Sequence, residues 1–78
     1  MFRGKYIVFE RGGLEYPVLF PNHFVDHNTV SVNYDKPVSA GFFCIDGEDV
    51  FVSGKSQTLM LSCRSEDADL IKRQLNPN

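Results

Sequence analysis

Apolar and polar residues alternate with a period of two from the start of this chain to about position 64. One run has an apolar side chain at every second position: Leu14, Tyr16, Val18 and Phe20. Because successive side chains of a β-strand point to opposite faces of a sheet, this spacing is typical of strands that pack one face against a core. The pattern predicts a mainly β protein.

Six segments carry the pattern, and short turns separate them. The expected strands are Lys5–Glu10, Leu14–Phe20, Thr29–Asp35, Val38–Ile45, Val50–Ser53 and Thr58–Arg64. Glycine, proline, asparagine and aspartate recur in the connections, and short connections favour antiparallel neighbours. Pro17 has no backbone N–H, which places its strand at a sheet edge or a bulge. We expect a curved antiparallel sheet or a small barrel of about six strands.

One segment near the end departs from the alternation. Ser65 is a residue type that caps helices, acidic residues fill the following turn, and Lys72 and Arg73 lie in the last turn. These charges match the helix dipole at both ends. Apolar residues form one stripe that can cover a sheet face: Ala68, Ile71 and Leu75. We therefore expect one C-terminal helix, ended by Asn76-Pro77.

The size of the chain limits its core. Its 78 residues contain no internal repeat or linker, so we expect a single domain spanning residues 1–78. Aromatic residues make up 13% of the chain, which argues for a packed core rather than disorder. A domain this small buries only about 60% of its unfolded surface. Because Val38–Ile45 also carries apolar residues on both faces, we expect the protein to form a homo-oligomer.

Cysteine usage and apolar run length indicate the compartment. The apolar runs are too short to span a membrane, and the N-terminus has no stretch of signal-peptide length. Cys44 and Cys63 are too few for a secreted disulfide framework, so we expect two reduced, buried thiols. These features predict a cytoplasmic protein without a membrane partner.

The charge balance disfavours nucleic acid as a partner. The formal net charge is -2, whereas nucleic-acid-binding surfaces are usually basic. Binding of a single strand stays open as an alternative if Arg3, Lys5 and Arg11 cluster with exposed aromatic side chains.

Three patterns suggest catalysis or a cofactor, and each is incomplete. Gly54-Lys55-Ser56 ends like a phosphate-binding loop, but Asp49 stands where the first glycine belongs and a strand pattern follows instead of a helix. His23 and His27 are four apart, but no third metal ligand accompanies them. The Gly-x-Ser-x-Gly elbow of hydrolases is missing. We expect no enzyme activity, no metal and no cofactor.

The start of the expected helix is the candidate ligand site. A helix N-terminus offers free backbone N–H groups to anions, and Arg64 adds a positive charge beside Ser65. The acidic first turn has an ordinary explanation in helix capping. Arg64 could equally form a structural ion pair, with Asp67 or with an acid of the turn Asp46–Asp49.

Two segments resemble parts of short uncharacterised proteins encoded by tailed bacteriophages: Pro37–Phe42 and Ser56–Ala68. The resemblance covers about half of the chain and implies no family function that can be assigned residue by residue. Small phage proteins of this kind often act by binding. They inhibit a host protein, or they sequester a host signalling nucleotide between subunits as an anti-defence measure. The resemblance would place this protein in the host cytoplasm.

Two hypotheses follow. The first is a homo-oligomeric protein that binds an anionic, nucleotide-like small molecule, with these contacts: Arg64, Ser65, Lys55, His23 or His27, and Phe43 as a stacking surface. The second is an inhibitor or adaptor that meets a host protein through a strand edge and the apolar residues Phe43 and Ile45.

Overall fold

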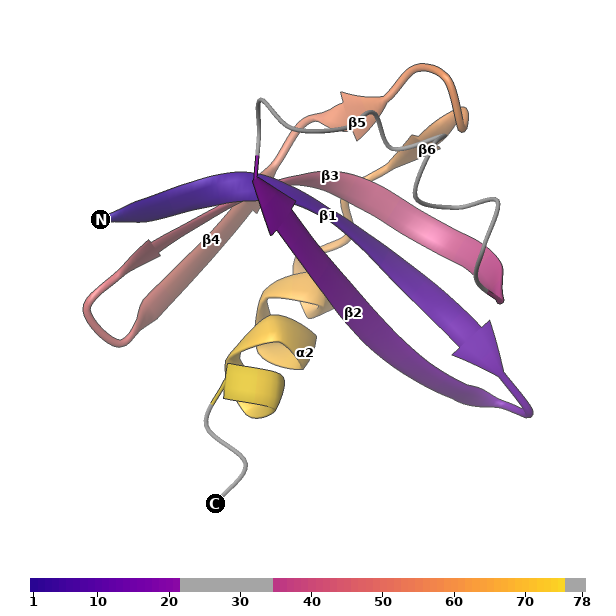
Figure 1. Ribbon diagram of the computed structural model, residues 1–78, viewed down its shortest axis with the longest axis horizontal. Coiled ribbons are helices and arrows are strands. Elements are labelled where there is room, and N and C mark those ends of the chain that lie inside the picture. Colours follow the sequence, from indigo (N-terminus) through magenta and orange to yellow (C-terminus); the bar gives the residue numbers. More distant parts are fainter. Residues whose placement is uncertain (22–34, 76–78) are drawn as a thin grey trace.

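The computed structural model describes residues 1–21 and 35–75 (Figure 1). In chain order its elements are β1 (Phe2–Arg11), β2 (Leu14–Pro21), β3 (Lys36–Asp46), β4 (Asp49–Ser53), β5 (Lys55–Ser56), β6 (Leu61–Ser62) and α2 (Ser65–Leu75). The mainly β architecture and the C-terminal helix are confirmed. The strand expected at Thr29–Asp35 lies outside the described residues, apart from Asp35 itself.

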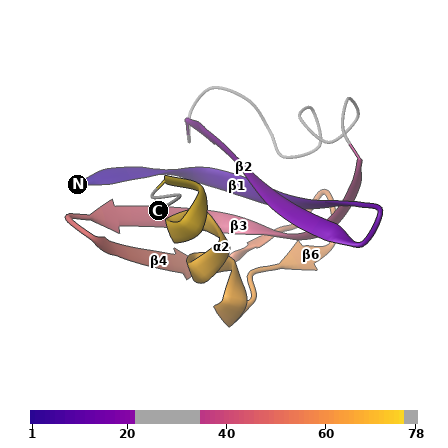
Figure 2. The same ribbon diagram turned by 90° about the horizontal axis from the view of Figure 1, so that it is seen from below.

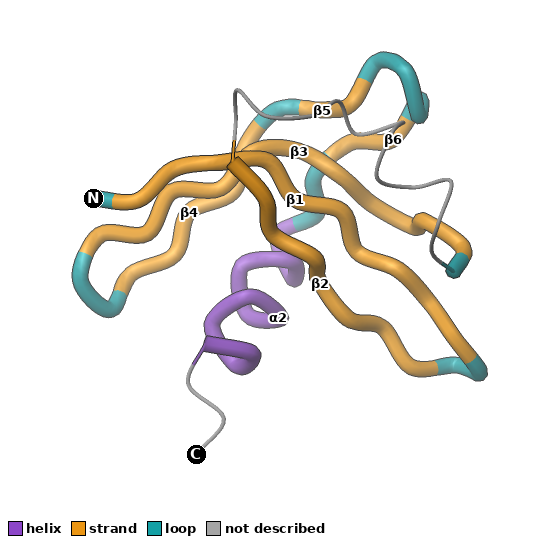
Figure 3. Tube along the Cα trace, viewed as in Figure 1, coloured by secondary structure: helices purple, strands orange, loops and turns teal. Residues whose placement is uncertain are grey.

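The first four strands form one antiparallel sheet in the order β2-β1-β3-β4 (Figure 3). Gly12 and Gly13 join β1 to β2, and their φ values of 58° and 84° are those of a turn whose twist suits a two-residue hairpin. The edge position of β2 confirms the placement of Pro17. Because β2 and β4 are the two edges, the described strands form an open sheet, and the alternative of a small barrel is not confirmed.

The segment expected as a single strand at Thr58–Arg64 is a turn followed by a short strand. Gly54 has a φ of 75°, and after it β5 and β6 form a small hairpin around a turn at positions 57–60. Met60, at the end of this turn, has a φ of 56° and is 90% exposed. Two nearby apolar side chains pack against the same cluster in the sheet: Leu59 and Leu61. The alternating apolar residues of the segment Thr58–Arg64 therefore come partly from the turn and partly from β6.

The sheet buries apolar side chains on both faces, and α2 covers one of them (Figure 2). The cluster on the helix side is centred on Tyr6, Val8, Phe43 and Ile71. The opposite cluster is centred on Ile7, Phe9, Phe20 and Ala40. Because β1 is a central strand covered on both faces, it contains an unbroken run of buried residues from Tyr6 to Phe9.

The two cysteines are less buried than expected. Cys44 and Cys63 are both half-buried, so the expectation of full burial is wrong. Cys44 lies opposite Phe51, close to the sheet edge that β4 forms. Cys63 follows β6 and packs against the rim of the helix-side cluster. Cys44 lies two residues before the end of β3, and Cys63 lies just after β6, so both are close to strand ends.

The start of α2 is held by an acidic residue. The helix begins at Ser65, which makes Arg64 the residue before the first helical position. The Asp67 carboxylate accepts a hydrogen bond from the Arg64 backbone N–H at 2.9 Å, as one half of a capping box does. Arg64 therefore takes the N-cap position expected of Ser65, and the Asp67 side chain bonds back to its N–H from inside the first turn. Among the described residues, no helix is long and apolar enough to span a membrane.

Candidate functional site

Arg64 lies in a network of carboxylates that joins α2 to the sheet. Its Nε and Nη2 atoms each lie 2.9 Å from Asp67 Oδ1, and Nη2 also lies 2.9 Å from Glu15 Oε1 on β2. Glu66 is a more distant partner at 3.8 Å. Asp67 is fully buried, and the Tyr6 hydroxyl of β1 donates to its Oδ2 atom at 2.6 Å.

These contacts raise two pKa values, that of the Arg64 guanidinium and that of the Tyr6 hydroxyl. The hydrogen bond to Glu15, followed by that to Asp67, raises the pKa of the Arg64 guanidinium above its already high value. Burial, followed by the hydrogen bond to Asp67, raises the pKa of the Tyr6 hydroxyl. Arg64 is therefore a permanent cation whose donors face carboxylates. The expected alternative of a structural ion pair between Arg64 and Asp67 is present in the fold.

The other residues proposed as ligand contacts differ in their exposure. Phe43 is only 2% exposed and stacks on Phe2 with ring centroids 5.6 Å apart, so the prediction of Phe43 as an open stacking surface is wrong. It packs under α2 because it points to the helix-side face of β3. Ser65 is exposed at the helix start, and Lys55 is exposed on β5. His23 and His27 lie outside the described residues.

An apolar cavity of about 330 Å³ lies between the sheet and the last residue of α2. The described residues that line it are all uncharged: Phe2, Leu19, Phe20, Pro21, Ile45 and Leu75. Phe2 is 58% exposed and Leu75 is 51% exposed, so two wall residues present apolar surface to water. We call this the apolar cavity.

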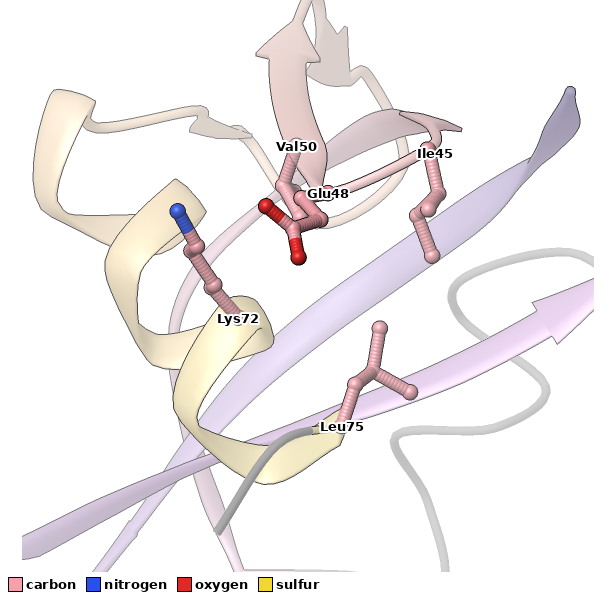
Figure 4. A pocket seen from close by; sticks show the side chains of 6 residues that line it. Ile45, Glu48, Val50, Lys72 and Leu75 are labelled. Atoms are coloured by element: carbon pink, nitrogen blue, oxygen red, sulfur yellow. The ribbon is translucent and has the colours of Figure 1, made fainter. Parts of the chain in front are cut away.

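A second cavity of about 290 Å³ shares Ile45 and Leu75 with the first. Figure 4 shows the Lys72 amine and the Glu48 carboxylate on one side of it, Ile45 on the opposite side and Leu75 below. Glu48 comes from the β3–β4 turn, and Lys72 comes from the last turn of α2. The two neighbouring cavities together form an apolar surface that lies beside the positive charge of Lys72 and the negative charge of Glu48.

This arrangement suits binding. The described residues that line the apolar cavity present hydrocarbon side chains, which bind by burying apolar surface. Within residues 1–21 and 35–75, no three histidine, cysteine, aspartate or glutamate side chains gather to hold a metal ion. What the cavity can do is remove apolar surface of a partner from water.

Sequence reasoning did not find this cavity. It placed Leu75 on the stripe that covers the sheet, yet only Ile71 of that stripe is fully buried. The helix buries Asp67, one turn before Ile71, whereas Leu75, one turn after Ile71, is 51% exposed. A sequence signal did exist, because Phe2 and Leu75 are large apolar residues at element ends. Their proximity depends on the tertiary fold.

Comparison with known proteins gives no match. No protein-family model, no curated protein and no solved structure is similar to this chain. The geometry of the chain itself therefore carries the functional argument.

Proposed function

We propose that this protein is a non-enzymatic binding module that holds an apolar side chain of a protein partner in the apolar cavity. The observation that carries the proposal is the position of Phe2 and Leu75, which are each more than half exposed at a cavity of about 330 Å³. Large apolar side chains exposed together are typical of protein interaction sites. The volume lies within the range of ligand pockets, about 300–1,000 Å³.

The lining predicts the chemistry of the partner. A segment with one large apolar residue, such as Leu, Met, Phe or Trp, matches a cavity whose described lining residues are uncharged. Burying an aromatic side chain removes about 150–250 Å² from water, at about 25 cal/mol per Å² of apolar surface. Lys72 and Glu48 in the neighbouring cavity can orient polar groups that flank the apolar anchor.

The surroundings of Arg64 favour this proposal over capture of an anionic nucleotide. A phosphate at Arg64 would displace Glu15 and approach the buried carboxylate of Asp67. Like charges at such short range oppose binding.

Selection of peptides tests the proposal. A phage-displayed library of linear peptides is panned against the purified protein, and labelled copies of the enriched peptides are titrated by fluorescence anisotropy. The peptides are expected to share one large apolar residue. They are expected to bind Leu75→Glu at least about tenfold more weakly than wild type, because glutamate brings a charge to the apolar cavity.

Leu14→Glu is the matched control. Leu14 is 76% exposed at the start of β2 (Figure 1), and it lines neither of the two cavities that Leu75 lines. The same substitution there is expected to leave peptide binding unchanged, and circular dichroism verifies that both variants are folded. Failure to enrich any peptide would overturn the proposal, as would equal affinity of the peptides for wild type and Leu75→Glu.

A further inference from the structure

We propose that two copies of this chain pair antiparallel through β4, with Phe51 of each copy at the two-fold axis. This inference is separate from the proposed function, because it concerns the sheet edge and not the apolar cavity. β4 is the last strand in the order β2-β1-β3-β4 and has no strand partner on its outer side among the described residues (Figures 1 and 3). An edge strand of this kind is a template for pairing with another chain.

The hairpin register shows which backbone groups face outward. Asp46 and Asp49 close the two-residue turn between β3 and β4, and the first and fourth residues of such a turn are hydrogen-bonded. Hydrogen-bonded pairs alternate with non-bonded pairs in an antiparallel ladder, so Phe51 also bonds to β3. The N–H and C=O groups of Val50 and Val52 therefore point to the open edge.

The opposite edge of the sheet is protected, whereas β4 is not. Counting in the same way from the pair Arg11–Leu14 places Pro17 and Pro21 at the outward positions of β2. Proline there removes outward N–H groups without removing a bond inside the sheet. β4 lacks three common protections of an edge strand, because it contains no proline, no lysine and no register shift. Of the two described edges, only β4 therefore has a full set of outward N–H and C=O groups that can pair with another strand.

The sequence of β4 is complementary to itself. In an antiparallel pair centred on Phe51, Val50 of one copy faces Val52 of the other, and both outward-pointing groups of each residue find partners. Asp49 faces Ser53, so no like charges meet. The two Phe51 rings face each other at a non-hydrogen-bonded position, where side chains approach most closely and aromatic pairs contribute most. This pairing accounts for a Phe51 side chain that is 58% exposed in one copy.

A second copy fits this edge better than an unrelated strand does. A two-fold interface requires that one segment be complementary to itself, and the five residues of β4 satisfy this in register, charge and hydrogen bonding. The small core supplies a further reason, because a domain of this size gains stability from oligomerisation.

Cysteine cross-linking tests the register. In a chain whose two native cysteines are replaced by serine, Phe51→Cys is expected to give a covalent dimer on mild oxidation, because directly opposed residues lie within disulfide reach. Ser53→Cys in the same background is the control, since Ser53 faces Asp49 of the other copy. Equal cross-linking of the two variants, or none at either, would overturn the proposed pairing.

Sedimentation equilibrium at micromolar concentration tests the association itself. Wild type is expected to dimerise, and Phe51→Lys is expected to raise the dimer dissociation constant at least about tenfold, because it opposes two like charges at the axis. Leu14→Lys, at the start of the other edge strand, is expected to leave the constant unchanged. A wild-type monomer, or a folded Phe51→Lys variant that dimerises like wild type, would show the inference to be wrong. Peptide binding in the apolar cavity is independent of either result.

Discussion

Two buried serines differ in what their hydroxyl groups contact. The Ser39 hydroxyl is completely buried and has no hydrogen-bond partner among the described residues. The Ser56 hydroxyl is 3.3 Å from the Thr58 hydroxyl and accepts a hydrogen bond from the Leu59 N–H at 3.3 Å. A buried polar group without a partner lowers stability, whereas a satisfied group supports the turn that it bonds.

The two serines should therefore respond in opposite directions to the same substitution. Ser39→Ala is expected to raise the free energy of unfolding by about 1 kcal/mol, and Ser56→Ala is expected to lower it by about 1 kcal/mol. Urea denaturation followed by circular dichroism measures both, at one fixed protein concentration because dimerisation would shift apparent stability. A loss of stability in Ser39→Ala would contradict the reasoning.

At the scale of elements, Arg64 holds the start of α2 to β2. Removing its side chain leaves the Asp67 carboxylate buried without a cation, with hydrogen bonds from the Tyr6 hydroxyl and the Arg64 backbone N–H. Arg64→Ala is expected to lower the free energy of unfolding by about 2–3 kcal/mol, since its side chain is only 27% exposed and an unpaired buried charge is unfavourable.

Arg73 is the matched control on the same helix. It is exposed, and its Nε atom lies 3.5 Å from the Asp69 carbonyl oxygen. Arg73→Ala is expected to change stability by about 0.5 kcal/mol or less. Thermal denaturation of both variants separates a structural role for Arg64 from a general effect of lost positive charge. Equal stability of the two variants would show that the Arg64 network does not hold the helix.

At the scale of the whole molecule, a buried hydrogen bond links the sheet to α2. The Tyr6 hydroxyl on β1 donates to Asp67 on α2, residues that are 61 positions apart in the chain. Burial and this hydrogen bond raise the pKa of Tyr6 above its ordinary value of 10.0. The unfolded chain therefore loses the Tyr6 proton at a lower pH than the folded chain does. The stabilisation is fully present below about pH 10 and is lost as the pH rises above it.

Comparison of wild type with Tyr6→Phe isolates this effect from other alkaline titrations. Wild type is expected to have the higher melting temperature at pH 8, because Tyr6→Phe removes a hydrogen bond to a buried carboxylate. The difference is expected to narrow as the pH rises above about 10. Differential scanning calorimetry from pH 8 to pH 11 measures it. Parallel curves for the two proteins would contradict the role given to Tyr6.

Local patterns in the sequence determined the type of most described elements. Alternation is a property of neighbouring residues, so it predicted β1 to β4 within a few positions. The acidic residues at the start of α2 and the basic residues at its end predicted the helix. Pro17 predicted an edge because the missing N–H excludes a central position. The turn at positions 57–60 was missed, because apolar residues there imitate the alternation of a strand.

The tertiary structure alone decided which of these residues are accessible. Phe43 and Phe51 both lie in alternating strands, yet one is buried under α2 and the other lies exposed on an edge strand. Strand order decides this, and it results from pairings between distant segments that no local pattern contains. From the sequence, Arg64 at a helix start is a candidate phosphate contact. In the fold its guanidinium instead donates a hydrogen bond to Glu15, which is 49 positions away in the chain. The sequence determined which faces are apolar, and long-range packing determined which of them a partner can reach.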